Sequence, residues 1–400
     1  MKICLHTIWE ISHNYIGGTE RFLINFSKEL QLLGHDPFIV CTSKTRECII
    51  EGVKVLGRYS EKLEDYPYFS SKFIKNEIIG ETYSEDSLKR LSVYTLSQIE
   101  GIEADIFHFN SFISVSYLKG LENLNCVITN HENRREYDWY WGEGFFDLFK
   151  SLVNTQKTNL HKVNNLFTPS NHYAIEFSKE FNLPVKNIQL GVSLDYFKPS
   201  KKKEGLRLEY DLKDEIILLL PSRFQPHQKG HDIALKACKL LKDNGVNFII
   251  IFTGVKKSSE KYKSVFDDLV FNYGLQKNVK VVTFPDINEA YQGADIVISP
   301  ERFCSYGLSI SESLALGIPT VLSDIPTYVE IAKKYSHASF FKSESAEDLH
   351  DKIRDVIQKN EIRNHDSAAD FRCDNDIRDC AKNYYKVYRE TLNRSTIDFD

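Results

Sequence analysis

Short apolar runs alternate with helix-like periodicity along most of the chain, and this alternation occurs twice. In the first half, strands are predicted at residues 2–7, 37–42, 104–108, 126–129 and 165–168. In the second half, they are predicted at residues 216–220, 248–253, 279–284, 295–299 and 319–322. Strands separated by helices form mostly parallel sheets that helices cover on both faces. The pattern therefore predicts an α/β fold with two Rossmann-like, doubly wound domains facing a central cleft.

A charged segment, Ser200 to Gly205, separates the two halves and is interpreted as a linker. The predicted domains are residues 1–198 and residues 206–378. The end of the chain is helical by periodicity from Ala346 to Leu392. Residues 379–400 are expected to return to the first domain, with an apolar face at Tyr384, Tyr385, Val387 and Tyr388.

Composition excludes several classes of protein. The formal net charge of -5 offers no basic surplus for nucleic acid, so an anionic ligand needs a local cationic site. No apolar run reaches the roughly 18 residues that span a bilayer. The eight cysteines show no C-x-x-C spacing, which argues against structural zinc and predicts buried free thiols in a reducing cytoplasm. No metal site is predicted.

The stretch from Ser299 to Asp324 has the form of a nucleotide site. A strand ends at Ser299, a turn closes on Gly307, and a helix follows. The first N–H groups of a helix favour an anion, here beside Tyr306, Gly307 and Leu308. Glu312 lies further along the helix and is a candidate to hold the two hydroxyls of a ribose. The alternative is a scaffold unit with a solvated glutamate.

Two cations follow the first strand of the second half. Arg223 and Lys229 lie six residues apart on a loop at the carboxyl end of that strand, where open parallel sheets bind ligands. Arginine can hold a phosphate with two parallel bonds, and lysine adds a point charge. Together they could neutralise a diphosphate without a metal; alternatively, both are solvated loop cations.

The first half contains two weaker candidates. Gly17 and Gly18 precede a helix without the spacing G-x-G-x-x-G, so they are either a tight turn beside a phosphate or acceptor, or merely the start of that helix. His131 follows a predicted strand and could contact a transferred group as a hydrogen-bond donor or proton carrier, although a lone histidine is also commonly structural.

An aromatic segment, YDWYWGEGFFDLF, runs from Tyr137 to Phe149. Such a segment is typical of an acceptor loop that stacks on carbohydrate or touches a membrane, and equally of a helix packed in the core.

Taken together, these motifs resemble the retaining glycosyltransferases of the GT-B fold, specifically glycosyltransferase family four. The resemblance extends over nearly the whole chain. It is carried by GGTERF, FHFNS around His108, the histidine after a strand at His131, FTPSNHY, LGVSLDYFKP, SRFQPHQKG and SPERFCSYGLSISESLALGIP.

The resemblance implies a metal-independent hexosyltransferase that moves a sugar from a UDP-sugar or GDP-sugar to a glycan, lipid-linked or protein acceptor with retention. It implies a cytoplasmic protein of polysaccharide biosynthesis, with peripheral membrane contact left open. In this scheme Arg223 and Lys229 bind the donor diphosphate, Glu312 holds the ribose, and the backbone from Tyr306 to Leu308 contacts the phosphate or sugar. Gly17 and Gly18 line the cleft near the diphosphate, and His131 contacts the donor sugar.

The chain departs from the family at one position. The family signature is Glu, seven residues, Glu; Glu312 is the second, but Cys304 occupies the first place. A neutral thiol cannot accept hydrogen bonds from hydroxyls as a carboxylate does. One hypothesis is that Glu301, three residues earlier, takes this role. The alternative is a nucleotide-sugar-binding subunit that is catalytically impaired.

Overall fold

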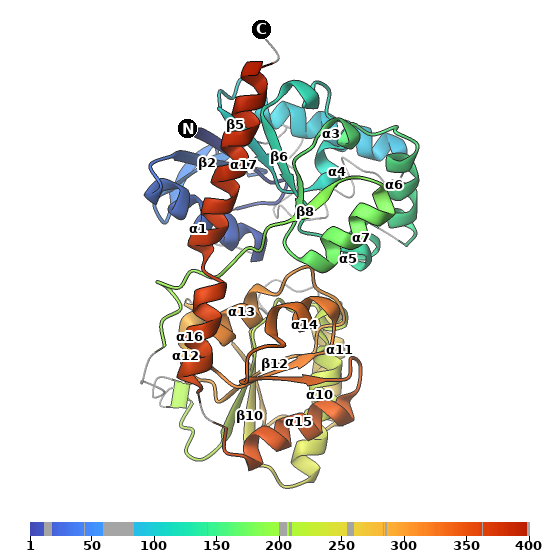
Figure 1. Ribbon diagram of the computed structural model, residues 1–400. Helices are drawn as coiled ribbons and strands as arrows, with labels where there is room; N and C mark the ends of the chain where they lie inside the picture. The colour runs from blue at the N-terminus through green and yellow to red at the C-terminus, as the bar shows by residue number, and fades with distance from the viewer. Residues whose placement is uncertain are drawn as a thin grey trace. The chain divides into compact units, whose positions relative to one another are not determined.

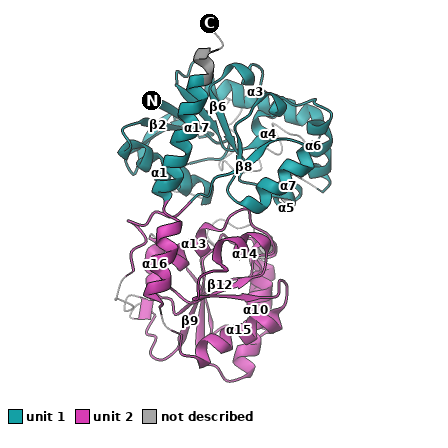
Figure 2. Ribbon diagram, in the orientation of Figure 1, with its two compact units in different colours: residues 1–190, 377–400 teal, residues 191–376 magenta. Residues whose placement is uncertain are grey.

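The computed structural model describes residues 1–11, 18–43, 45–58, 84–141, 143–199, 206–207, 210–253, 260–282, 284, 286–361 and 363–397. The chain divides into two compact units, which Figure 2 shows in different colours. The first comprises residues 1–190 and 377–400, and the second comprises residues 191–376. The last helix therefore belongs to the first unit, as expected from its aromatic face.

The first unit is built on an eight-stranded sheet of order β3-β4-β2-β1-β5-β6-β7-β8. Figure 1 labels β2, β5, β6 and β8 of this sheet. All pairings are parallel except the one between β3 and β4. The strands are β1 Lys2–His6, β2 Asp36–Cys41, β3 Glu47–Ile50, β4 Val53–Gly57, β5 Ile106–Phe109, β6 Cys126–Thr129, β7 Leu166–Thr168 and β8 Val185–Asn187. The helices are α1 Gly18–Leu32, α3 Glu85–Ile99, α4 Phe112–Val115, α5 Arg134–Trp141, α6 Phe145–Asn154, α7 Asn171–Phe181 and α17 Ile377–Ile397.

The second unit has a six-stranded, wholly parallel sheet of order β11-β10-β9-β12-β13-β14. Its strands are β9 Ile216–Leu220, β10 Phe248–Thr253, β11 Val279–Val282, β12 Ile296–Ser299, β13 Thr320–Ser323 and β14 Ala338–Phe341. Its helices are α9 Pro226–Lys229, α10 His231–Asp243, α11 Glu260–Asn272, α12 Ile287–Gly293, α13 Leu308–Ala315, α14 Pro326–Ala332, α15 Ala346–Gln358 and α16 His365–Asp374.

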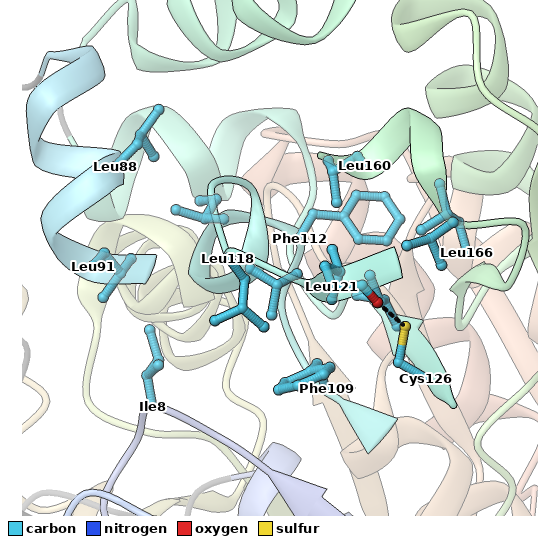
Figure 3. Close-up of a cluster of buried hydrophobic side chains, with 14 of the residues drawn as sticks. Ile8, Leu88, Leu91, Phe109, Phe112, Leu118, Leu121, Cys126, Leu160 and Leu166 are labelled. Carbon is cyan, nitrogen blue, oxygen red and sulfur yellow. Dashed lines mark hydrogen bonds between the residues drawn. The ribbon is translucent and has the colours of Figure 1, made fainter. Parts of the chain in front are cut away.

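Each sheet has its own hydrophobic core. In the first unit, Figure 3 shows side chains of α3, β5, α4 and β6 meeting, among them Leu91, Phe109 and Phe112, and the Cys126 thiol donates to the carbonyl of Leu121 at 3.6 Å. The second core lies around Leu218, Ile250 and other buried strand residues. Parallel strands buried on both faces read as continuous apolar runs, which is why the sequence pattern predicted these strands.

The aromatic segment is part of this first core. Tyr137 on α5 and Phe145, Phe146 and Phe149 on α6 are all buried, with ring centroids of Tyr137 5.6–6.2 Å from the three phenylalanines. For these four residues, the interpretation as core helices is confirmed. Gly142 lies outside the described residues.

The C-terminal helix α17 is anchored to the first sheet by buried polar groups. The Tyr388 hydroxyl lies 2.7 Å from His108 Nδ1, and the Tyr384 hydroxyl lies 2.7 Å from Thr129 Oγ1. Thr129 in turn lies 2.7 Å from the other nitrogen of His108. Each buried polar atom thus has a partner, which offsets the cost of removing it from water.

None of the eight cysteines forms a disulfide bond. Six of these free thiols are buried, while Cys48 is partly buried and Cys373 is exposed. Among the helices within the described ranges, none combines the length and apolarity needed to cross a bilayer.

Candidate functional site

The candidate site in the second unit lies where its sheet changes direction. Strand β9 pairs on one side with β10 and on the other with β12, so the chain order reverses between β9 and β12. Ligands of open α/β sheets bind beyond the carboxyl ends of the strands at such a point. The loop after β9 carries Arg223 and Lys229, and the loop after β12 carries Glu301, Cys304 and Gly307.

These two loops are locked together by a close backbone approach and an ion pair. Gly230 has φ +65°, and a Cβ there would lie 1.9 Å from the carbonyl oxygen of Pro300. The Arg302 N–H donates to the carbonyl of Gln228 at 3.0 Å. Its guanidinium forms two bonds, of 2.9 and 2.7 Å, with the Asp232 carboxylate. Such bidentate geometry fixes both loops in one arrangement.

Lys229 is a buried cation rather than a solvated one. Its Nζ lies 2.8 Å from Glu301 Oε1, and the two side chains are only 12% and 2% exposed. Burial would lower the pKa of Lys229, but the facing Glu301 carboxylate outweighs it, so this pKa lies above its ordinary value. The solvated-cation alternative is therefore wrong for Lys229.

The second carboxylate oxygen of Glu301, Oε2, is not the one that contacts Lys229. Oε2 is buried and has no hydrogen-bond partner within 3.5 Å among the described residues, although the Tyr328 hydroxyl is close enough for the Glu301 carboxylate to contribute to the raised pKa of this tyrosine. An unpaired buried carboxylate oxygen is costly, and such groups mark places that a ligand completes. Glu301 is a candidate from the sequence alone, but no motif indicates that it pairs with Lys229.

Arg223 and Cys304 are the other members of this cluster. Arg223 is exposed, and its positive charge acts to lower the pKa of Lys229, so its guanidinium lies within electrostatic reach of the ammonium. Cys304 is buried, and its carbonyl accepts a hydrogen bond of 2.9 Å from the Thr327 hydroxyl. The structure thus brings together Arg223 and Lys229, predicted to bind the diphosphate, and Glu301 and Cys304, the two residues considered for the sugar hydroxyls.

Helix α13 begins next to this cluster. Gly307 precedes it with φ 106°, and a Cβ there would lie 2.7 Å from a ring carbon of Tyr328. The Tyr306 side chain is buried, and its hydroxyl accepts a hydrogen bond of 3.3 Å from the Gly191 N–H. Only the backbone of Tyr306 and Leu308 therefore remains a candidate for an anion at the helix start.

Glu312, one turn into α13, is oriented by a partner that sequence analysis missed. The Tyr291 hydroxyl, on α12, lies 2.7 Å from Glu312 Oε2. Tyr291 is buried, and its burial together with the Glu312 charge raises its pKa well above the ordinary value, so it stays a neutral donor. A tyrosine 21 positions earlier leaves no motif in the sequence that could have revealed this contact.

The first sheet also reverses its strand order, between β1 and β5. His131 lies just beyond β6, with Nε2 2.9 Å from Asn110 Oδ1, and Asn110 follows β5. Burial lowers the pKa of His131 to about 4, so its ring is neutral near pH 7 and is a poor proton carrier. Asn110 was missed, although its place directly after a strand end was the available signal.

The glycine pair is only partly described. Gly18 is the first residue of α1 and is exposed, whereas Gly17 lies outside the described residues. Across the described ranges, no three His, Cys, Asp or Glu side chains are gathered closely enough to hold a metal ion.

Two family models match successive parts of this chain. Residues 16–196 match glycosyltransferase family 4, and residues 203–369 match glycosyl transferases group 1. The chain therefore belongs to the group 1, family 4 glycosyltransferases.

Curated relatives and solved structures agree with this assignment. The O-antigen biosynthesis glycosyltransferase WclY of Escherichia coli is 28% identical over 131 residues, which are 32% of this chain and 35% of that protein. The match thus spans about a third of that relative. The N,N'-diacetylbacillosaminyl-diphospho-undecaprenol alpha-1,3-N-acetylgalactosaminyltransferase of Campylobacter jejuni is 24% identical over 64% of this chain and 68% of its own.

Among solved structures, Anabaena HepE in complex with UDP-glucose aligns with a TM-score of 0.70 at 15% identity, over 98% of this chain and 100% of that one. At this identity the similarity shows the fold. The expected GT-B fold is confirmed, with two doubly wound α/β units and a C-terminal helix that packs on α1 of the first unit.

Proposed function

We propose that this protein transfers a sugar from a nucleoside diphosphate sugar to an acceptor with retention of anomeric configuration. In this proposal the second unit binds the donor and the first unit binds the acceptor. The observation that carries it is the buried Lys229–Glu301 pair, with Arg223 within electrostatic reach, at the reversal point between β9 and β12.

The chemistry of sugar transfer explains why these cations are needed. As the bond between sugar and diphosphate breaks, negative charge develops on the departing diphosphate. Lys229, held charged by Glu301, and the guanidinium of Arg223 stabilise that charge, and the backbone N–H groups at the start of α13 add to it. Because these groups are fixed before the reaction, little reorganisation is needed in the transition state.

The contacts of Glu312 and Glu301 support roles for these two residues, and the family resemblance supports those of His131, Gly17 and Gly18. Glu312, oriented by Tyr291, accepts hydrogen bonds from the ribose hydroxyls. Glu301 Oε2 is the acceptor for a hydroxyl of the donor sugar, a role that Cys304 at the family position cannot fill. From the family resemblance alone, we propose contact with the donor sugar for His131 and a role near the diphosphate for Gly17 and Gly18.

The relatives suggest the substrates. The HepE complex supports a UDP-sugar as the first donor to test, with GDP-sugars next. The Campylobacter relative, named as acting on an undecaprenol-linked substrate, supports a lipid-linked glycan as acceptor. We accordingly propose a cytoplasmic enzyme of polysaccharide biosynthesis that meets its acceptor at the membrane surface.

The presence of Cys304 favours one competing function, a subunit that binds nucleotide sugars without turning them over. Release of free nucleoside diphosphate from UDP- and GDP-sugars, with and without a polyprenyl-diphosphate-linked glycan, separates the two. The transferase proposal predicts acceptor-dependent release and an α- or β-linkage matching the donor. Nucleotide binding without release under any condition would instead support the binding subunit.

A pair of lysine variants locates the activity. Lys229→Ala should lower turnover by ~10²-fold or more, since one preorganised electrostatic contact can contribute that much. Lys236→Ala is the matched control, because Lys236 pairs with Glu347 on the surface and both side chains are more than half exposed. We expect its turnover to match wild type; wild-type turnover in Lys229→Ala would mean that the donor site lies elsewhere.

A further inference from the structure

The orientation of the Asn110 amide is fixed by two backbone carbonyls. Its Nδ2 donates to the carbonyl of His6 at 3.1 Å and to that of His108 at 3.3 Å. The amide oxygen must therefore point the other way, and it lies 2.9 Å from His131 Nε2. An amide oxygen is only an acceptor, so His131 Nε2 has to carry the hydrogen of this bond.

This assignment decides what the opposite side of the ring can do. A neutral imidazole with a proton on Nε2 has a free lone pair on Nδ1. Among the described residues, no group hydrogen-bonds Nδ1, and His131 retains 9% of its surface exposure. The exposed side of His131 is thus an acceptor and cannot donate.

We propose that Asn110 is a positioning residue that fixes His131 as a hydrogen-bond acceptor at Nδ1, so that this edge of the first sheet binds a hydroxyl group of the substrate. The kinetic consequence rests on the proposed transferase function, whereas the tautomer of His131 does not. The hydroxyl belongs either to the donor sugar or to the acceptor glycan, and the kinetic experiment below separates these sources.

The surroundings of His131 keep it neutral. Burial is the cause of its lowered pKa of about 4. At the carboxyl-terminal parts of strands β1 and β5 lie His6 and His108, whose pKa values burial lowers to about 4 and about 3. The ring centroid of Phe22, on α1, lies 5.8 Å from that of His131. Glu132 is the next residue along the chain. A carboxylate at position 110 would therefore be a new charge facing Nε2.

Nuclear magnetic resonance tests the tautomer directly in the wild-type protein. With ¹⁵N-labelled histidine, the spectrum of His131→Ala identifies the His131 signals among those of the 12 histidines. We expect a protonated Nε2 and an unprotonated Nδ1, unchanged between about pH 8 and about pH 5.5. A proton on Nδ1, or titration within this range, would overturn the proposal.

The Asn110→Asp variant tests the function of that tautomer. The new carboxylate favours the imidazolium and raises the pKa of His131, and the protonated ring loses its Nδ1 lone pair. As pH falls through the raised pKa, kcat/KM should drop about tenfold per pH unit, whereas wild type shows no such limb above about pH 5. Asn123→Asp, which places the same charge at an exposed position, should retain the wild-type profile.

A double variant and a comparison of donor hydrolysis with sugar transfer extend this experiment. In the double variant Asn110→Asp, His131→Gln the acid limb should disappear, because glutamine does not titrate. A limb seen in acceptor-free donor hydrolysis assigns the hydroxyl to the donor sugar, and a limb seen only during transfer assigns it to the acceptor. A wild-type pH profile in folded Asn110→Asp contradicts the proposal. If wild type shows no turnover, the transferase proposal fails, and the resonance experiment still decides the tautomer.

Discussion

At the scale of single residues, the Lys229–Glu301 pair is better explained by function than by stability. Both side chains are nearly buried, and the cost of removing two charges from water can exceed their mutual attraction. Arg302 already holds the same two loops through Asp232 and the Gln228 carbonyl. A charged lysine kept in place by a carboxylate with a spare oxygen suits a site that meets both a diphosphate and a sugar hydroxyl.

Comparing Glu301 with Cys304 tests which of them serves the sugar. We expect Glu301→Gln to lower kcat by ~10²-fold, because it weakens both the hold on Lys229 and the acceptor for the hydroxyl. Cys304→Ala should stay within a few-fold of wild type, since a neutral thiol contributes little as an acceptor. Steady-state kinetics with the same donor measures both. Full activity in Glu301→Gln would remove this residue from the mechanism.

Sequence reasoning located candidate residues by their position after strand ends, and it missed residues that act through them. Arg223, Lys229, His131 and Glu301 all follow a strand, so topology alone predicted where they would gather. Tyr291 reaches Glu312 from another helix, and no local pattern records that contact.

At the scale of elements, fully buried strands were the most predictable. Strands β9, β10 and β6 have the predicted bounds, because they are buried on both faces. The hairpin β3–β4 and strands β8 and β14 were missed, and several of their residues are not buried. The helical region from Ala346 onward is divided into α15, α16 and α17.

A pair of glycine variants tests the close approach between the loop after β9, at Gly230, and the loop after β12, at Pro300. Gly230 and Gly245 both have positive φ, but a Cβ at Gly245 meets nothing within 4 Å. Gly245→Ala should lower the free energy of unfolding by about 1 kcal/mol through backbone strain alone. Gly230→Ala should cost at least about 1–3 kcal/mol more, since its Cβ collides with the Pro300 carbonyl.

Urea unfolding of the two full-length variants measures this difference, and turnover assays accompany it. We expect Gly230→Ala also to lose activity, because Lys229 is its neighbour, while Gly245→Ala keeps it. Equal unfolding midpoints for the two variants would show that the close approach between the loops is not needed.

At the scale of the whole molecule, the chain carries two doubly wound units, each with its own reversal of strand order. The candidate residues gather at both points: the Lys229–Glu301 cluster in the second unit, and the Asn110–His131 pair in the first. Under the proposed function, the second unit holds the charged diphosphate and hydroxyls of the donor, and the first unit supplies a further hydroxyl acceptor at His131.

Hydrogen exchange of the full-length protein with and without UDP, and in parallel GDP, tests the central claim most directly. The account predicts that the nucleotide it uses slows exchange in residues 221–230 and 300–312, including the N–H groups at the start of α13. Protection confined to residues 1–190, or none with either nucleotide, would contradict a diphosphate site between β9 and β12.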